Sequence, residues 1–131
     1  MSTRSTTTLE WNGQRVQLYR HHDGYFEGGA GETIQDLVAS DPTRPDELLR
    51  RLVSMRYPRT TFEPEDFPGR LVYEWTGSEH GDLEYMYRVR WTDDPNTYKA
   101  VPELHYCHIL ENGEWSDWID ATPTECVNDA N

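Results

Sequence analysis

The sequence has few cysteines and no long apolar run, and both absences limit the class of protein it encodes. Its two cysteines, Cys107 and Cys126, belong to no CxxC pair and suggest no disulfide framework. No apolar N-terminal stretch resembles a signal peptide, and no run reaches the length of a membrane span. We therefore expect a protein of the cytoplasm, in a reducing environment and with no membrane partner.

Basic residues are scarce as well. The chain carries 24 Asp plus Glu against 12 Lys plus Arg, a formal net charge of −12, and Lys99 is its only lysine. Because phosphate neutralisation dominates affinity for nucleic acid, this balance argues against direct nucleic-acid binding. Two interpretations of the acidity stay open. An acidic face could imitate nucleic acid and occupy a basic site on a partner protein, or the acid could be a solvated surface suited to a salt-rich host.

Aromatic residues offset a low apolar content. Only 35% of the residues are hydrophobic, yet five Trp, eight Tyr and three Phe supply large areas for burial. A length of 131 residues indicates one domain, and a chain of this size holds a core without staples. We expect an aromatic core.

Hydrophobic periodicity predicts the order of the elements. In LEYMYRVRW, apolar and polar residues alternate, so that Tyr85, Tyr87 and Val89 share one strand face. The Asn12-Gly13 pair is a strong hairpin signal. The expected elements are strands at 9–11 and 15–20, helices at 32–39 and from Pro45 with Thr43 as its N-cap, and strands within 70–77, 83–91, 98–110 and 114–120.

This order predicts an α+β fold, with a mostly antiparallel sheet of about five to six strands and two helices packed on one face. We expect a flexible, Ser/Thr-rich N-terminal arm over residues 1–8 and a single α+β domain over 9–120. A loosely held C-terminal tail is expected over 121–131.

The stretch LYRHHDGYFEGG, residues 18–29, concentrates polar chemistry. A histidine oriented by an aspartate, here His21 and Asp23, could act as a general acid/base with or without a metal. Adjacent strand residues point to opposite faces, however, and a metal site needs more ligands than this. A structural interpretation has Asp23-Gly24 forming a turn and Arg20 pairing with a carboxylate. We predict no catalytic residues, no metal and no cofactor.

Two further polar motifs lack a complete signature. GYFEGGAGE precedes a predicted helix but lacks GxxxxGK[ST] and GxGxxG; a helix N-terminus could still accept an anion. HGDLEY, residues 80–85, is expected to form a turn that leads into a strand. Cys107 as a nucleophile would need a base and a lowered pKa.

Both stretches also carry a family resemblance. YRHHDGYFEGGAGETIQDL is similar to a YRHxDGYPxGxGxxL signature, and HGDLEYMYRV resembles a HGDxEYxYxV stretch. Both patterns occur in small, mostly uncharacterised proteins of phages, prophages and other mobile elements. The resemblance covers residues 16–37 and 80–89, with Phe26 where the signature has Pro. It implies a mobile-element setting, in the cytoplasm of a host cell, and no particular chemistry.

We expect the two stretches to be neighbours in space and to form one binding site. The candidate binding residues are Tyr19, Arg20, His21, Asp23, Tyr25, His80, Asp82 and Glu84. The leading hypothesis is a non-enzymatic anti-defence protein whose acidic surface blocks a host protein that binds nucleic acid. The alternatives are a nucleotide-binding protein that uses Tyr19, Arg20, Tyr25 and the glycine loop, and a small hydrolase. The sequence leaves the oligomeric state open.

Overall fold

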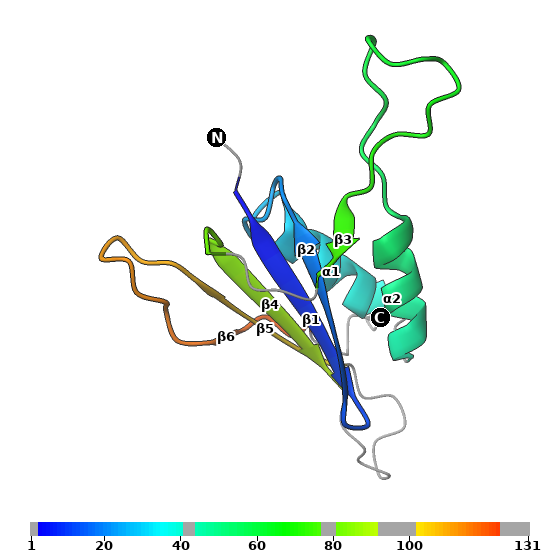
Figure 1. Ribbon diagram of the computed structural model, residues 1–131. Helices are drawn as coiled ribbons and strands as arrows, with labels where there is room; N and C mark the ends of the chain where they lie inside the picture. The colour runs from blue at the N-terminus through cyan, green and yellow to red at the C-terminus, as the bar shows by residue number, and fades with distance from the viewer. Residues whose placement is uncertain (1–2, 41–43, 77–80, 92–101, 124–131) are drawn as a thin grey trace, which may run out of the picture.

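The computed structural model describes residues 3–40, 44–76, 81–91 and 102–123 (Figure 1). Strands and helices follow one another in the predicted order, two strands, two helices and four strands. They are β1 (Ser5–Trp11), β2 (Gln14–Arg20), α1 (Ala30–Ser40), α2 (Pro45–Ser54), β3 (Tyr73–Trp75), β4 (Tyr85–Arg90), β5 (Glu103–His108) and β6 (Ile119–Asp120).

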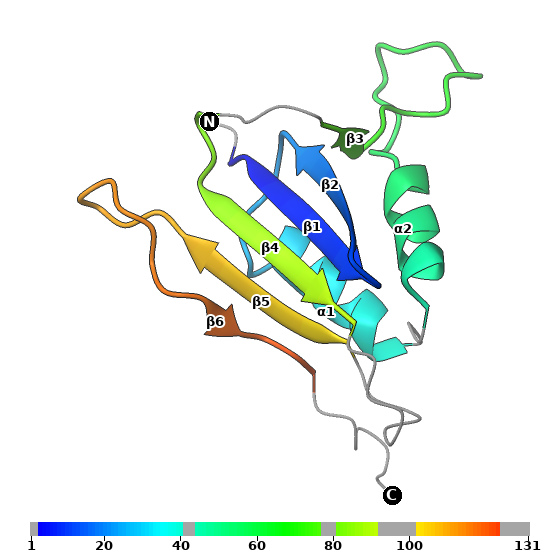
Figure 2. The same cartoon turned by 60° about the horizontal axis from the view of Figure 1, so that its bottom comes forward.

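The six strands form one sheet in the order β3-β2-β1-β4-β5-β6, which Figure 2 shows face-on. Every neighbouring pair is antiparallel except β1 and β4, which run parallel. The turn between β1 and β2 has positive φ at Asn12 (48°) and Gly13 (74°), as a two-residue hairpin of the primed type requires. The fold is therefore α+β with a mostly antiparallel sheet, as predicted.

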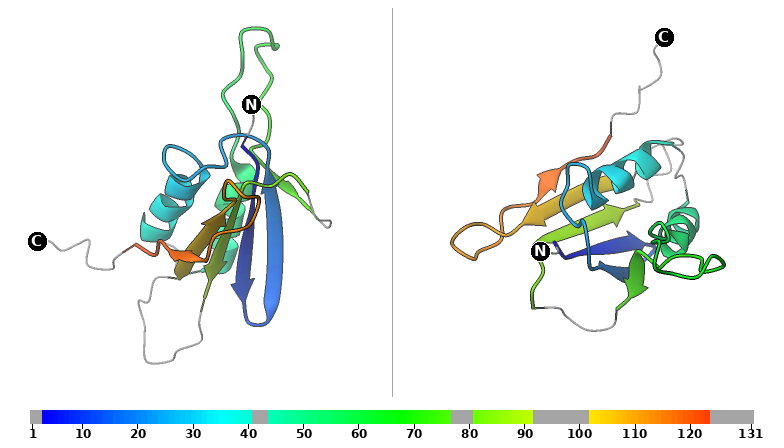
Figure 3. Two further views of the ribbon diagram at one scale, coloured as in Figure 1. Left: turned by 90° about the vertical axis from the view of Figure 1, so that its left-hand side faces the viewer. Right: turned by 90° about the horizontal axis from the view of Figure 1, so that it is seen from above.

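Both helices lie on the same face of the sheet (Figure 3). α1 begins two residues before the predicted start at Glu32. In α2, Pro45 stands in the first turn and Arg44 is the residue that precedes the helix, whereas Thr43, the predicted N-cap, lies outside the described residues.

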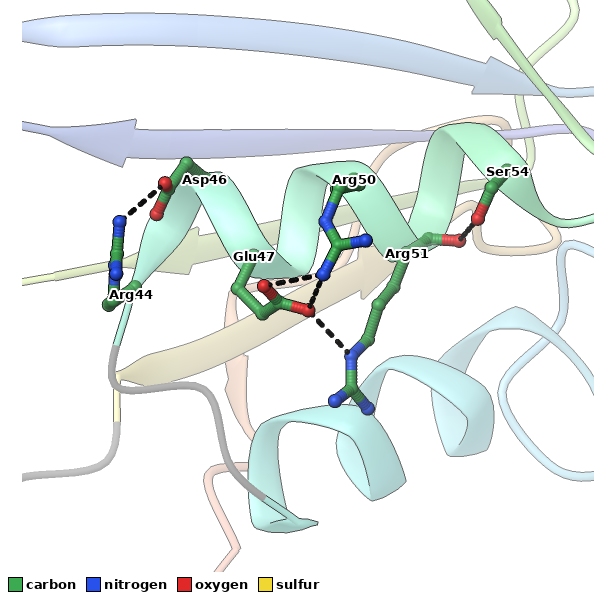
Figure 4. Close-up of polar contacts among 6 residues, drawn as sticks. All are labelled: Arg44, Asp46, Glu47, Arg50, Arg51 and Ser54. Carbon is green, nitrogen blue, oxygen red and sulfur yellow. Dashed lines mark hydrogen bonds and ion pairs between the residues drawn. The ribbon is translucent and has the colours of Figure 1, made fainter.

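The outer face of α2 neutralises its own charges. The carboxylate of Glu47 accepts hydrogen bonds from Arg50 at 2.6 Å and from Arg51 at 3.4 Å, and Arg44 pairs with Asp46 at 2.9 Å (Figure 4). Exposed ion pairs of this kind add little to the stability of a helix, because solvent screens them. They leave this face with little charge to offer a partner, while Leu48 on the inner face is buried against the sheet.

The core lies between the sheet and the two helices. Tyr87 and Val89 of β4 are 1% and 0% exposed, so the alternation in this segment predicted the buried face correctly. Burying side chains of this size contributes about 1.5–3 kcal/mol each. The remaining buried apolar members of this cluster are Leu9, Leu18, Ala30, Ile34, Val38, Leu48, Leu52, Val72, Tyr73 and Leu104.

The expectation of a flexible arm over residues 1–8 is wrong for residues 5–8. Ser5, Thr6, Thr7 and Thr8 belong to β1 and are no more than 8% exposed. β1 lies in the interior of the sheet between β2 and β4, so its backbone is hydrogen-bonded on both sides. Threonine is β-branched and packs well on a pleated surface, which suits a strand in this position.

The tail is also held at its start. The N–H of Ala121 donates to the carbonyl of Leu104 at 2.8 Å, and its carbonyl accepts from the Gln35 side chain at 3.0 Å. The expectation of a loosely held segment therefore fails at Ala121, and residues 124–131 lie outside the described residues.

Gly24 joins the turn after β2 to the sheet. Its N–H donates to the carbonyl of Thr3 at 2.8 Å, and its own carbonyl accepts from the hydroxyl of Tyr87 at 2.7 Å. A Cβ at this position would lie 2.8 Å from the Cβ of Ser5 and 2.8 Å from the Thr3 carbonyl oxygen. The junction therefore needs a residue without a side chain.

We predict that Gly24→Ala lowers the free energy of unfolding by about 1–3 kcal/mol, because the new methyl group overpacks a closed junction. Gly81→Ala is the matched control, since a Cβ there meets no atom within 4 Å. Urea unfolding followed by tryptophan fluorescence measures both variants. Equal stability of the two would contradict the role given to Gly24.

Candidate functional site

The two polar stretches meet at one end of the sheet, as predicted, but they do not pair with each other. β1 runs between them, and its register places Ser5 beside Arg20 of β2 and beside Tyr85 of β4. Just before β1, the carbonyl of Arg4 accepts the N–H of Glu84 at 2.9 Å. The end of β2 and the start of β4 thus flank the start of β1.

On the face without helices, Tyr19 is the centre of a small polar cluster. Its hydroxyl lies 3.0 Å from Nδ1 of His21. Burial, followed by the negative charge of Asp82, raises the pKa of Tyr19, while Arg4 opposes the increase. Arg4 in turn pairs with Asp82 at 3.0 Å. Tyr19, His21 and Asp82 are therefore brought together, whereas His80 lies outside the described residues.

Arg20 points to the opposite face, where it is 6% exposed. Its Nε donates to the carbonyl of His22 at 2.7 Å, its Nη1 contacts the hydroxyl of Tyr73 at 3.4 Å, and its guanidinium lies 5.5 Å from the Tyr73 ring centroid. Within the described part of the chain it forms no ion pair, so the predicted carboxylate partner is wrong. Neutral oxygens and an aromatic face replace it, and Arg20 fixes the end of β2.

Asp23 shapes the turn after β2 through its backbone conformation and its side-chain contact. Its φ is 57°, a left-handed conformation that Asp tolerates better than most residues, and its carboxylate accepts from the hydroxyl of Tyr25 at 3.1 Å. His21 bonds to a different tyrosine, and no hydrogen bond joins His21 to Asp23. The two residues do not form an acid/base pair.

The amides of the glycine loop from Gly28 onward are not free to bind an anion. Every backbone N–H from Gly28 to Thr33 donates within the loop and the first turn of α1, with the Glu32 carboxylate accepting the first of them at 2.9 Å. Phosphate cradles work by presenting such N–H groups to the ligand. The loop is therefore closed on itself and holds its position by these bonds.

The loop instead builds one wall of a groove, which we call the aromatic groove. Its volume is about 390 Å³. The lining residues are Tyr25, Phe26, Glu27, Tyr85, Tyr106 and His108. Phe26 packs on the ring of Tyr106 with centroids 4.7 Å apart, and Gly31 permits this because a Cβ there would overlap the ring of Phe26. Tyr25 was a candidate binding residue, whereas the other five were not.

A second surface begins where the groove ends. The chain leaves β5 at His108 and forms a hairpin over residues 109–120, closed by the bridge between Ile109 and Trp115 and by the pairing of β6 with β5. Figure 2 shows it, in orange, extending beyond the end of the sheet. We call it the acidic-aromatic hairpin. It carries four carboxylates and no Lys or Arg.

Large apolar side chains are exposed on this hairpin. They are Ile109 (38%), Leu110 (40%), Trp115 (38%), Trp118 (43%) and Ile119 (38%). The ring of Trp118 stacks on Arg88 of β4, with the guanidinium 4.5 Å from the ring centroid. Sequence reasoning missed this surface, and the signal for it was the segment EWSDWID, where two tryptophans alternate with acid.

The part of the chain that the structure describes holds neither a metal site nor a reactive thiol. No three His, Cys, Asp or Glu residues approach closely enough there to hold a metal ion. Burial raises the pKa of the Cys107 thiol, with Arg88 acting against it, so the sulfur stays protonated at neutral pH. No helix among these residues has the length and apolarity needed to cross a membrane.

Comparison of the chain with protein-family models, curated proteins and solved structures finds no match. The resemblance to mobile-element proteins therefore stays a prediction.

We predict that the free energy of unfolding falls as the pH rises above 10, because burial raises the pKa of Tyr87 above its ordinary value of 10.0. The unfolded chain loses the phenol proton near pH 10, whereas the folded chain keeps it. The contribution of Tyr87 to stability is therefore complete below this pH. Above it, the free energy of unfolding due to Tyr87 falls by about 1.4 kcal/mol per pH unit. Denaturant titrations over a series of alkaline buffers measure the slope.

Tyr87→Phe should reduce this slope by about 1.4 kcal/mol per pH unit, since phenylalanine does not ionise. The slope that remains is due to other buried phenols such as Tyr73, whose pKa burial also raises. Tyr57→Phe, which removes a phenol from the segment between α2 and β3, should keep the slope due to Tyr87. A Tyr87→Phe protein with the full alkaline slope would show that other groups cause it.

Proposed function

We propose that this protein acts by binding, and that its acidic-aromatic hairpin docks on a basic, nucleic-acid-binding surface of another protein. The observation that carries the proposal is the composition of residues 109–120. Five exposed large apolar side chains stand among four carboxylates, with no cation in the segment.

The apolar side chains supply the attraction at short range. Exposed apolar side chains are ordinary when scattered singly, but a contiguous set marks an interaction site. Tryptophan is the residue most enriched among interface hot spots, because it buries a large area at a low entropic cost. Trp115 and Trp118 are therefore the proposed anchors.

The carboxylates determine the charge that the partner surface must carry. Glu111, Glu114 and Asp117 are exposed and form no ion pair within the described part of the chain. Together with the net charge of −12, they attract a basic surface and repel an acidic one. Proteins that bind nucleic acid present such basic surfaces.

A binding function agrees with the internal contacts of the polar stretches. His21 and Asp23 bond to separate tyrosines, and Arg20 is held by neutral oxygens. These contacts stabilise the fold instead of presenting a reactive group. In the mobile-element setting that the resemblance implies, such a protein would block a host defence protein in the host cytoplasm.

We predict that the variant Trp115→Ala/Trp118→Ala weakens partner binding about thirtyfold or more, since one hot-spot residue contributes about 2 kcal/mol. The immobilised protein captures its partner from a host-cell lysate at low salt, and mass spectrometry identifies it. The purified partner is then tested for loss of binding to a DNA duplex when the wild-type protein is added. Retention of DNA binding, or no capture at low salt, overturns the proposal.

A charge variant separates specific docking from general acidity. Glu111→Gln/Glu114→Gln/Asp117→Asn should weaken the inhibition and reduce its salt dependence. The control Asp36→Asn/Glu65→Gln/Asp66→Asn removes three exposed carboxylates elsewhere and should inhibit as the wild type does. Equal losses in the two variants would mean that net charge alone is responsible.

Binding of a small anion is a second candidate, favoured by a groove beside β3. This groove has a volume of about 560 Å³, and its lining includes His21, His22, Arg56, Tyr57 and Arg70. Arg56 forms no ion pair with a described carboxylate, and Tyr57 offers a ring for stacking. A nucleotide would place its phosphate here instead of on the glycine loop.

A mononucleotide that binds this groove should raise the melting temperature by mass action. Arg56→Gln should remove the increase, and Arg44→Gln, on the outer face of α2, should keep it. A set of nucleoside monophosphates, tested by thermal shift at low salt, decides the question. An unchanged melting temperature with all of them rejects this second function.

A further inference from the structure

The aromatic groove has a composition that suits a cation. Of its six lining residues, four are Tyr or Phe and a fifth is His108. The sixth is the exposed carboxylate Glu27, and no Lys or Arg lines the groove. A cation over the face of an aromatic ring is attracted by the ring quadrupole, and a carboxylate at the rim adds to that attraction.

The rings are held in place by their packing. Tyr85 and Tyr106 stand on neighbouring strands with centroids 6.4 Å apart and planes 21° apart, and Tyr87 stacks under both. Tyr87 is fixed by its bond to Gly24, so the base of the groove is rigid. A preorganised wall loses little entropy when a ligand enters.

Hydrogen-bond acceptors are also available at the groove. Tyr85 and Tyr106 are half-buried, and their hydroxyls make no hydrogen bond to any residue that the structure describes. Glu27 likewise forms no ion pair there. Two phenol oxygens and a carboxylate are thus available at the groove as hydrogen-bond acceptors.

The surrounding charge is negative. The carboxylates of both Glu84 and Glu27 lie close enough to raise the pKa of Tyr85, after burial and the neighbouring Tyr106. The hydrogen bond to Asp23 raises the pKa of Tyr25, and the positive charge of Arg20 opposes this increase. The Nε of Arg20 is bonded to the carbonyl of His22, however, and Arg20 does not line the groove. The loop amides from Gly28 to Thr33 donate to acceptors within the loop and the first turn of α1, so they are not available to an anion.

We propose that the aromatic groove binds a guanidinium group, presented as an arginine side chain by the basic partner. A guanidinium fits better than an ammonium because it is planar, stacks on rings and donates several hydrogen bonds in a fixed geometry. The groove adjoins the acidic-aromatic hairpin at His108 and Ile109, so one partner would reach both. The identity of the bearer rests on the proposed function, whereas the affinity for guanidinium does not.

The test uses a small probe and no partner. N-acetyl-arginine-amide is titrated into the whole protein at low salt, and the aromatic NMR signals of Tyr85 and Tyr106 report binding. N-acetyl-citrulline-amide, a neutral analogue of the same shape, is the ligand control. We expect saturable shifts with the arginine probe and none with citrulline. Equal shifts with both probes, or shifts confined to Trp115 and Trp118, would overturn the proposal.

Two variants test the walls of the groove. Glu27→Gln should weaken binding of the arginine probe about three- to tenfold, as expected for loss of a charged acceptor beside a cation–π contact. Its matched control is Asp36→Asn, an exposed carboxylate on α1 outside the groove, which should change the affinity little. Tyr106→Leu should abolish the binding, and its thermal melt shows whether the fold is kept. Equal effects of Glu27→Gln and Asp36→Asn would reduce the site to general acidity and reject it.

The two proposals fail in different ways. If the arginine probe binds in the groove but no basic protein is captured, the guanidinium site is supported and the docking function is rejected. If a basic partner binds through Trp115 and Trp118 but the probe shifts no tyrosine, docking stands and the guanidinium site is rejected.

Discussion

The junction at Gly24 is the constraint on which the rest of the structure depends. One backbone unit bonds to Thr3 through its N–H and to the hydroxyl of Tyr87 through its carbonyl. Because Gly24 has no side chain, the turn after β2 approaches β1 closely enough for both bonds to form. These bonds set the direction in which the chain leaves the sheet, and hence where the glycine loop and α1 begin.

The position of the aromatic groove depends on that junction. The loop is closed by its own amide hydrogen bonds, so Phe26 and Glu27 are presented at a defined place over β4 and β5. Buried Tyr87 supports Tyr106 from below. The acidic-aromatic hairpin leaves β5 at the same end of the sheet. Apolar anchors and carboxylates are therefore gathered in one region, while the outer face of α2 pairs its own charges.

The fold was predictable from the sequence to a greater extent than the site. Alternation found the buried face of β4, and Asn12-Gly13 marked the first hairpin. His21 and Asp23 do not form the acid/base pair that their spacing allowed, because each bonds to a tyrosine two positions away along the chain. The groove could not be predicted, since its walls come from a loop and two strands whose pairing is a long-range choice.

The sequence by itself determined the order of the elements, the acidic charge and the alternation that marks β4, because these depend on neighbouring residues and on periodicity. The tertiary structure decided the position of β1. Its Ser and Thr residues suggested a mobile arm, yet the strand lies inside the sheet, parallel to β4. The reason is physical: a threonine-rich segment is polar in isolation, and only a neighbouring strand on each side satisfies its backbone and covers its side chains.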